Sequence, residues 1–146
     1  MAVQYREEDD TYYLRERVGN QTIELGMNFY DENLHDRKSW WNVYITVFNK
    51  RKDMYTNMDK KIITGKNPFA TVLTAKKMFK KVEAHLIDHE LTHGPFDEIT
   101  IFCTWVDNRR RDAYYKVLSK MGYNWGRVDK EKCIMKTFRI NPKEIE

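Results

Sequence analysis

Alternating apolar and polar positions in the first third of the chain predict a meander of antiparallel strands. Residues 11–18 and 22–30 alternate on either side of a Gly-Asn pair, which predicts a β-hairpin. Residues 31–36 are polar and predict the next turn, and residues 39–49 carry the strongest strand pattern. Because both faces of this third strand are apolar, the pattern predicts a central strand that is covered on both sides.

The periodicity becomes helical after a basic connection. Asn67 suits an N-cap, Pro68 suits the first helical position, and Gly94 with Pro95 predicts the end of the helix. Apolar residues recur at spacings of three and four and predict a stripe that faces the core: Val72, Ala75, Phe79, Val82 and Leu86.

The rest of the pattern alternates strands with a helix. Residues 98–106 predict a buried strand, residues 107–123 a second helix, and residues 133–140 a last strand. The predicted element order is therefore β-β-β-α-β-α-β. We expect a mixed α/β sheet of the α+β class, formed by a single domain over residues 1–146.

The composition is that of a globular chain without a strong preference for one class of partner. The chain is 41% hydrophobic, and 26 basic against 22 acidic residues leave a net charge of +4. This small excess permits an anionic partner, but nucleic acid is not favoured, since nucleic-acid binders usually concentrate their charge more.

No apolar run approaches the roughly 20 residues of a membrane helix, and the first residues lack the apolar core of a signal peptide. We therefore expect a cytoplasmic protein without a membrane partner, in which Cys103 and Cys133 are buried, reduced thiols.

Residues 89–93 read HELTH and match the H-E-x-x-H pattern of zinc metalloproteases. In such a site two histidines one helical turn apart bind zinc, and a third ligand follows downstream. Here Gly94 and Pro95 end the predicted helix at once, and no histidine follows His93. We therefore expect HELTH to be the end of a structural helix without a metal, with a metalloprotease as the minor alternative.

Two predicted helix starts have the chemistry of a phosphate site. Residues 64–67 read TGKN, a glycine-bearing turn before a helix whose free N–H groups and dipole suit a phosphate. Residues 108–112 read NRRRD at the start of the second helix, and arginine is suited to phosphate. An ordinary capped helix and a salt-bridged, solvated face explain the same two patterns, so both interpretations stay open.

The element order, together with "TGKNPFATVLTAKKMF" and "DNRRRDAYYKVLSKMGY", resembles the GCN5-related N-acetyltransferase family. Within that family the chain looks most similar to small acetyltransferase-like proteins of phages, and the resemblance covers roughly residues 11–140. Family members have a strand meander leading to a central strand, and the next loop and helix N-terminus hold the pyrophosphate of acetyl-coenzyme A. The resemblance implies a cofactor-binding role for eight residues: Thr64, Gly65, Lys66, Asn67, Phe69, Ala70, Asn108 and Arg111.

The family often uses a tyrosine of the last helix as the acid and a carboxylate of the central strands as the base. The resemblance therefore implies Tyr115, or Tyr114 beside it, as the acid, and Glu24 as the nearest candidate base. The chain departs from the family in its loop, where the pattern Q/R-x-x-G-x-G/A meets Ile62 and Asn67 at the outer positions. It also departs at its start, because only about ten residues precede the first hairpin. The family usually places a strand and two helices there, and these build much of the acceptor pocket.

Two functions of different classes are consistent with this pattern. The first is an N-acyltransferase that uses acetyl-coenzyme A to acylate an amine of unknown identity, in the host cytoplasm if the chain is phage-encoded. The second is a non-catalytic protein on the same scaffold, which inhibits or modulates a host protein or nucleic acid. The chain has the sequence pattern of the family's cofactor site but lacks most of the elements that build its acceptor pocket. Both hypotheses therefore stay open.

Overall fold

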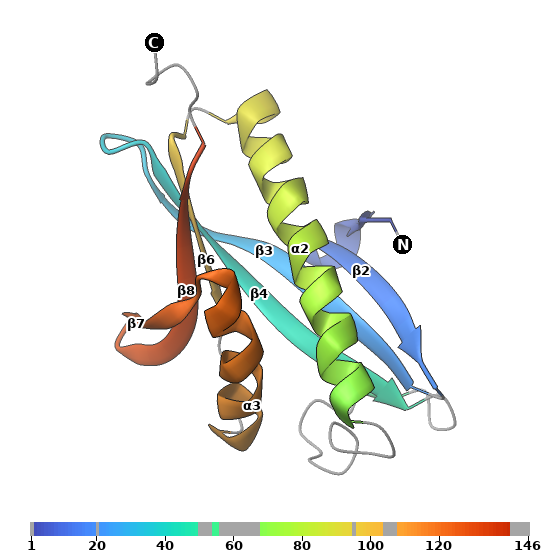
Figure 1. The fold of residues 1–146 in the computed structure, drawn as a ribbon. Coiled ribbons are helices and arrows are strands. Elements are labelled where there is room, and N and C mark those ends of the chain that lie inside the picture. Colours follow the sequence, from blue (N-terminus) through green and yellow to red (C-terminus); the bar gives the residue numbers. More distant parts are fainter. Residues whose placement is uncertain are drawn as a thin grey trace.

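Eight strands form one sheet in the computed structural model of the chain, which describes residues 2–19, 21–49, 54–55, 68–94, 96–103 and 108–140 (Figure 1). The strand order is β1-β2-β3-β4-β6-β8-β7, and β5 pairs with β4 beside this path. The described strands are β1 (Gln4–Arg6), β2 (Thr11–Val18), β3 (Gln21–Asn33), β4 (Lys38–Asn49), β5 (Met54–Tyr55), β6 (Glu98–Cys103), β7 (Asn124–Val128) and β8 (Glu131–Arg139). The described helical elements are α2 (Pro68–His93), α3 (Asn108–Leu118) and the 3-10 turns η1 (Glu7–Asp9) and η2 (Ser119–Met121).

The β4–β6 pair is parallel, whereas the other described strand pairs are antiparallel. A parallel pair needs a crossover connection. Helix α2 lies in this crossover and runs back across the sheet toward the start of β6 (Figure 1). The chain therefore has the mixed α+β sheet that its sequence predicts. None of the described helices combines the length and the apolar character needed to cross a membrane.

The predicted elements agree with the structure at their centres and differ at their ends. Strand β3 runs on to Asn33, where we expected a turn, because a bulge between Phe29 and Asp31 shifts the register and lets the polar residues pair with β4. The second helix ends at Leu118 rather than at residue 123, and η2 follows before Gly122 (φ 94°) turns the chain toward β7. The short strands β1, β5 and β7 were not predicted.

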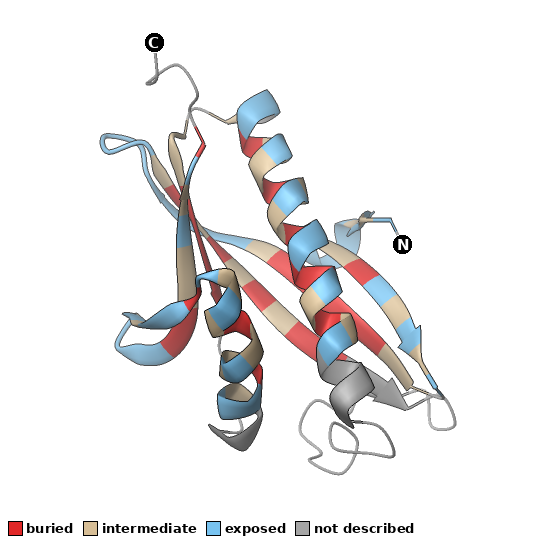
Figure 2. Cartoon of the chain, in the orientation of Figure 1, coloured by how far each residue is buried: buried red, intermediate tan, exposed pale blue. Residues whose placement is uncertain are grey.

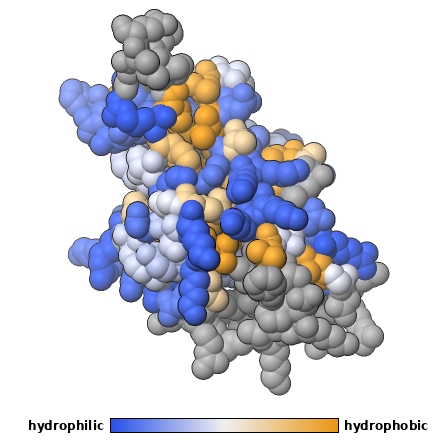
Figure 3. Space-filling model, viewed as in Figure 1, coloured by the Kyte–Doolittle hydropathy of each residue, from blue (hydrophilic) through white to orange (hydrophobic). Residues whose placement is uncertain are grey.

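Helices α2 and α3 contribute to one core cluster on the same face of the sheet. The predicted apolar stripe of α2 is confirmed for four residues, each 0% exposed: Ala75, Phe79, Val82 and Leu86. The side chain of Val72 lies outside the described part. Figure 2 shows the buried positions of α2 turned toward buried positions of the sheet, and Figure 3 shows mainly hydrophilic residues over the outer surface of this side. Cys103 and Cys133 are buried free thiols, as expected.

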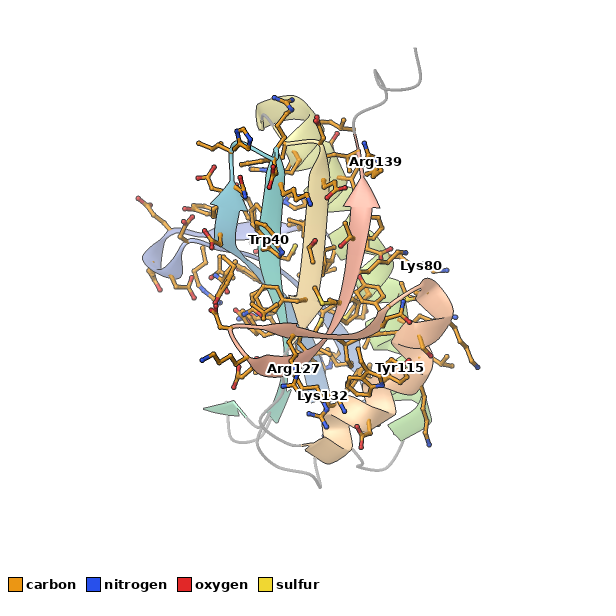
Figure 4. The ribbon with its side chains drawn as sticks, turned by 90° about the vertical axis from the view of Figure 1, so that its left-hand side faces the viewer. Trp40, Lys80, Tyr115, Arg127, Lys132 and Arg139 are labelled. Atoms are coloured by element: carbon orange, nitrogen blue, oxygen red, sulfur yellow. The ribbon has the colours of Figure 1, made fainter. Side chains whose placement is uncertain are left out.

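The two faces of β4 differ in how completely the described residues cover them. Trp41 belongs to the core that faces α2, whereas Trp40 and Tyr44 lie on the other face of β4 and are only half-buried. No described helix covers that face, which is turned toward the viewer in Figure 4. Tyr44 instead lies over Gly26 of β3, so closely that a Cβ at Gly26 would collide with the tyrosine ring. The apolar residues on this face therefore pack across neighbouring strands rather than against a second layer of helices.

Candidate functional site

Strand β6 pairs with β4 along its whole described length, from Glu98 to Cys103. Their parallel pairing covers β4 only as far as Val43, although β4 continues to Asn49 and meets β5 at its last two residues. In the described part of the chain, residues 44–47 therefore pair with β3 on one edge and with no strand on the other. An unpaired strand edge presents backbone N–H and C=O groups to an extended ligand.

Both described α-helices begin at this end of the sheet (Figure 1). Pro68 starts α2 and Asn108 starts α3, and the free N–H groups of a helix start attract anions. The predicted cofactor-binding residues 64–67 lie outside the described residues. Phe69 and Ala70 lie in the first turn of α2, and their side chains, like that of Asn108, are outside the described part. The backbone arrangement suits an anionic ligand that has an extended arm.

The two candidate acids on α3 have different surroundings. Tyr114 is 1% exposed and belongs to the core, so its phenol has no direct route to a substrate. Tyr115 is half-buried and stacks on Trp125 of β7 with ring centroids 4.3 Å apart. The guanidinium of Arg111 and the amine of Lys132 also lie over the Trp125 ring, at 5.2 Å and 4.3 Å from its centroid. Tyr115 is therefore the more accessible of the two tyrosines, and it lies in a basic and aromatic cluster.

The candidate base is far less accessible. Glu24 is 0% exposed, and its Oε1 accepts a hydrogen bond of 2.8 Å from Arg15 Nε. Arg6 Nη1 lies 3.6 Å from the same oxygen. Glu24 also alternates with the core residues of β3 and so lies on the face of the sheet opposite to Tyr115. The structure does not bring the predicted acid and the predicted base together.

A separate cavity of about 330 Å³ lies between the C-terminal half of α2 and strands β2, β3 and β4; we call it the α2 pocket. Aromatic side chains form much of its wall: Tyr12, Phe29, Trp41 and Phe96. Carboxylates line it from three elements, with Asp10 before β2, Glu32 on β3 and Glu90 on α2. Its described lining also includes His89 and Gly94, and contains neither lysine nor arginine.

HELTH therefore lies against the α2 pocket. Helix α2 ends at His93, as expected, and His85 and His89 both face Tyr12, with ring centroids at 5.0 Å and 5.6 Å from its ring. Glu90 is only 2% exposed, and its Oε1 lies 3.5 Å from His89 Nδ1. Among the described residues, no group of three or more His, Cys, Asp or Glu side chains is arranged to hold a metal ion. The described side chains thus provide an acidic and aromatic pocket at this place.

Burial shifts the pKa values of two side chains near the α2 pocket, Glu90 and His85. It raises the pKa of the Glu90 carboxyl, with His89 and the indole N–H of Trp41 opposing the rise and Glu32 adding to it. Burial also lowers the pKa of His85, and the neighbouring His89 lowers it further. The charged form of Glu90 is therefore disfavoured unless a positive group enters the pocket.

The sequence contains one indication of this pocket: a carboxylate, Glu90, at a position where the periodicity of α2 predicts an apolar residue. Glu90 lies four positions after Leu86 and continues the buried stripe of α2 with a carboxylate. A carboxylate is seldom fully buried without a partner. Tyr12 and Trp41 gave no such signal, because an aromatic residue at a strand position is equally suited to the core.

Comparison with known proteins gives no further guide to the function. No protein-family model, no curated protein and no solved structure matches the chain. A functional assignment therefore rests on the geometry of the β4–β6 edge and of the α2 pocket.

Proposed function

We propose that the chain is an N-acyltransferase of the GCN5-related type, which binds acetyl-coenzyme A at the carboxyl end of the described β4–β6 pair. The observation that supports this proposal is the edge of β4 at residues 44–47, which pairs with no strand in the described part of the chain and lies at the end of the sheet where α2 and α3 begin. The amide-bearing arm of coenzyme A is an extended ligand that suits such an edge, and its phosphates suit helix N-termini. The meander before β4, and the strand and helix after α2, follow the order that the sequence resemblance implies.

The residues of the chain have distinct proposed roles in this reaction. The bound cofactor supplies the acyl group as a thioester. The backbone of residues 44–47 holds the extended arm, and the starts of α2 and α3 face the phosphates. Tyr115 is the proposed acid, because Tyr114 is enclosed in the core. Holding an amine acceptor against the bound acyl group lowers the barrier, because the reaction between the two bound groups becomes effectively unimolecular.

A second function, binding without catalysis, is favoured by the position of Glu24. A general base must reach the proton that it removes. Glu24 is fully buried, is paired with Arg15 and lies on the opposite face from Tyr115. A protein that uses this scaffold only to bind a host protein or nucleic acid needs no such base.

Calorimetric titration of the intact protein with acetyl-coenzyme A and with coenzyme A tests the cofactor site. Lys66→Glu places a negative charge before α2, and we expect it to weaken binding at least about tenfold, which corresponds to about 1.4 kcal/mol. Lys77→Glu makes the same charge change at an exposed position farther along α2 and is expected to leave binding unchanged. Equal effects of the two substitutions, or no binding of either coenzyme, would overturn the placement.

Release of free coenzyme A distinguishes the two functions once cofactor binding is established. Release that depends on an added amine and declines in Tyr115→Phe supports the acyltransferase. Cofactor binding without release, across a panel of primary amines and amine-bearing peptides, supports the non-catalytic protein instead.

A further inference from the structure

We propose that the α2 pocket binds an alkylammonium group, with Glu90 as the counter-ion and aromatic rings around the cation. This site goes beyond the proposed acyl transfer, because it lies beside the C-terminal half of α2, away from the helix starts that suit the cofactor phosphates. The two proposals can therefore fail independently.

Glu90 is the main evidence that the pocket receives a ligand. Its side chain lines the cavity although the residue is only 2% exposed. Its Oε2 has no hydrogen-bond partner in the described part of the chain. A buried carboxylate oxygen without a donor is costly, and native proteins rarely retain one without a reason. A donor supplied by a ligand removes this cost.

The acidic side chains that line the α2 pocket favour a positively charged ligand. Asp10, Glu32 and Glu90 come from three different elements and line one cavity, whose described lining has no lysine or arginine. This acidic lining occurs in a chain whose net charge is +4, so it differs from the average surface. A cation is attracted to it, and an anion is repelled.

The aromatic walls favour an organic cation over a metal ion. Phe29 packs edge-on against Trp41, with centroids 5.4 Å apart and planes at 87°, and Tyr12 lies 6.3 Å from Trp41. Rings that hold each other in this way form a fixed wall for cation–π contacts with an ammonium group and its methylenes. The cavity volume of about 330 Å³ is suited to a small ligand or to a single side chain.

Gly94 gives the ligand access to the carboxylate. It lines the pocket next to Glu90, and a Cβ at this position would collide with Glu90 Oε2. The glycine therefore keeps open the space beside the Glu90 oxygen that has no described partner. An ammonium group that enters there can donate to Oε2 while its alkyl chain lies along the rings.

Titration of the intact protein with n-butylammonium, and with 1-butanol as its neutral analogue, tests the site. We expect saturable binding of the ammonium, shifts in the amide NMR signals of Glu90 and Gly94, and no saturable binding of the alcohol. Glu90→Gln keeps the shape of the side chain and removes its charge, so we expect at least about tenfold weaker binding. Glu131→Gln, at an exposed position on β8, is the matched control and is expected to bind as the unmodified protein does.

A second ligand, Nα-acetyl-lysine methylamide, keeps the side-chain ammonium of lysine. It tests whether the natural ligand is a lysine side chain of a protein or a free amine. Tighter binding of this compound than of n-butylammonium identifies a lysine side chain of a protein, and weaker binding identifies a free amine; either result supports an ammonium site. Equal affinity of the unmodified protein and Glu90→Gln, equal binding of 1-butanol, or binding of zinc without binding of either ammonium would overturn it. Glu90→Gln is expected to retain its affinity for acetyl-coenzyme A, so a loss of both affinities would also count against a separate site.

Discussion

Replacing Glu90 with glutamine should stabilise the protein at neutral pH, which is unusual for a change at a buried position. The carboxylate is 2% exposed, and Oε2 has no hydrogen-bond partner among the described residues. An unsatisfied buried acceptor costs about 1 to 3 kcal/mol and more when it is charged, and glutamine retains an acceptor oxygen but removes the charge. We therefore expect Glu90→Gln to raise the free energy of unfolding by about 1 to 3 kcal/mol at pH 7, or about 2 to 4 °C in Tm per kcal/mol.

The stabilisation should depend on pH in a defined direction. Burial raises the pKa of Glu90 above its ordinary value of 4.5, so the folded state binds this proton more tightly than the unfolded state. Below that ordinary value both states are protonated, and the carboxylate causes no loss of stability. As pH rises through the raised pKa, the unmodified protein loses stability relative to Glu90→Gln, and above that pKa the difference is constant.

Urea denaturation followed by circular dichroism between pH 4 and pH 8 measures this difference directly. Glu131→Gln serves as the control, since an exposed carboxylate should give nearly the same curve as the unmodified protein. A variant Glu90→Gln that is less stable at pH 7, or a difference that does not change with pH, would refute the reasoning. The first result would mean that Glu90 has a stabilising partner in the folded protein.

Three further predictions test the packing. Phe79→Ala removes a ring that is 0% exposed and should cost about 3 to 5 kcal/mol in urea denaturation. Gly26→Ala should cost about 1 to 3 kcal/mol because its methyl group meets the ring of Tyr44, and most of this loss should disappear in a Tyr44→Ala background. A double-mutant cycle of Tyr115→Ala and Trp125→Ala should give a coupling of about 0.5 to 1.5 kcal/mol, and a coupling near zero would contradict their stacking.

The sequence predicted the elements that have a long and regular pattern. The stripe of α2 has one residue on its core face in nearly every turn, so both its existence and its orientation could be predicted. Strand β7 could not be predicted in the same way, because NWGRV is short and contains Gly126. That glycine is explained only by its tertiary neighbour, since a Cβ there would collide with the side chain of Met135.

The candidate sites differ in the same way: the helix starts could be predicted from neighbouring residues, whereas the α2 pocket could not. Helix starts have local signals, and both predicted starts are confirmed at Pro68 and Asn108. The α2 pocket depends on residues that are far apart in the sequence, such as Tyr12 and Glu90. Their meeting depends on the sheet order and on the direction of α2, which no local pattern contains.

The parallel pairing of β4 with β6 has a consequence for the order of folding. At the start of this pair, Arg37 Nε donates to Asp97 Oδ2 at 2.8 Å across a sequence separation of 60 residues. The antiparallel meander of β2, β3 and β4 closes through short turns, whereas the parallel pair must close a long stretch of chain before any contact stabilises it. We therefore expect the meander to form first and β6 to join it late. Weakening the contact between Arg37 and Asp97 should then mainly accelerate unfolding and leave the folding rate almost unchanged.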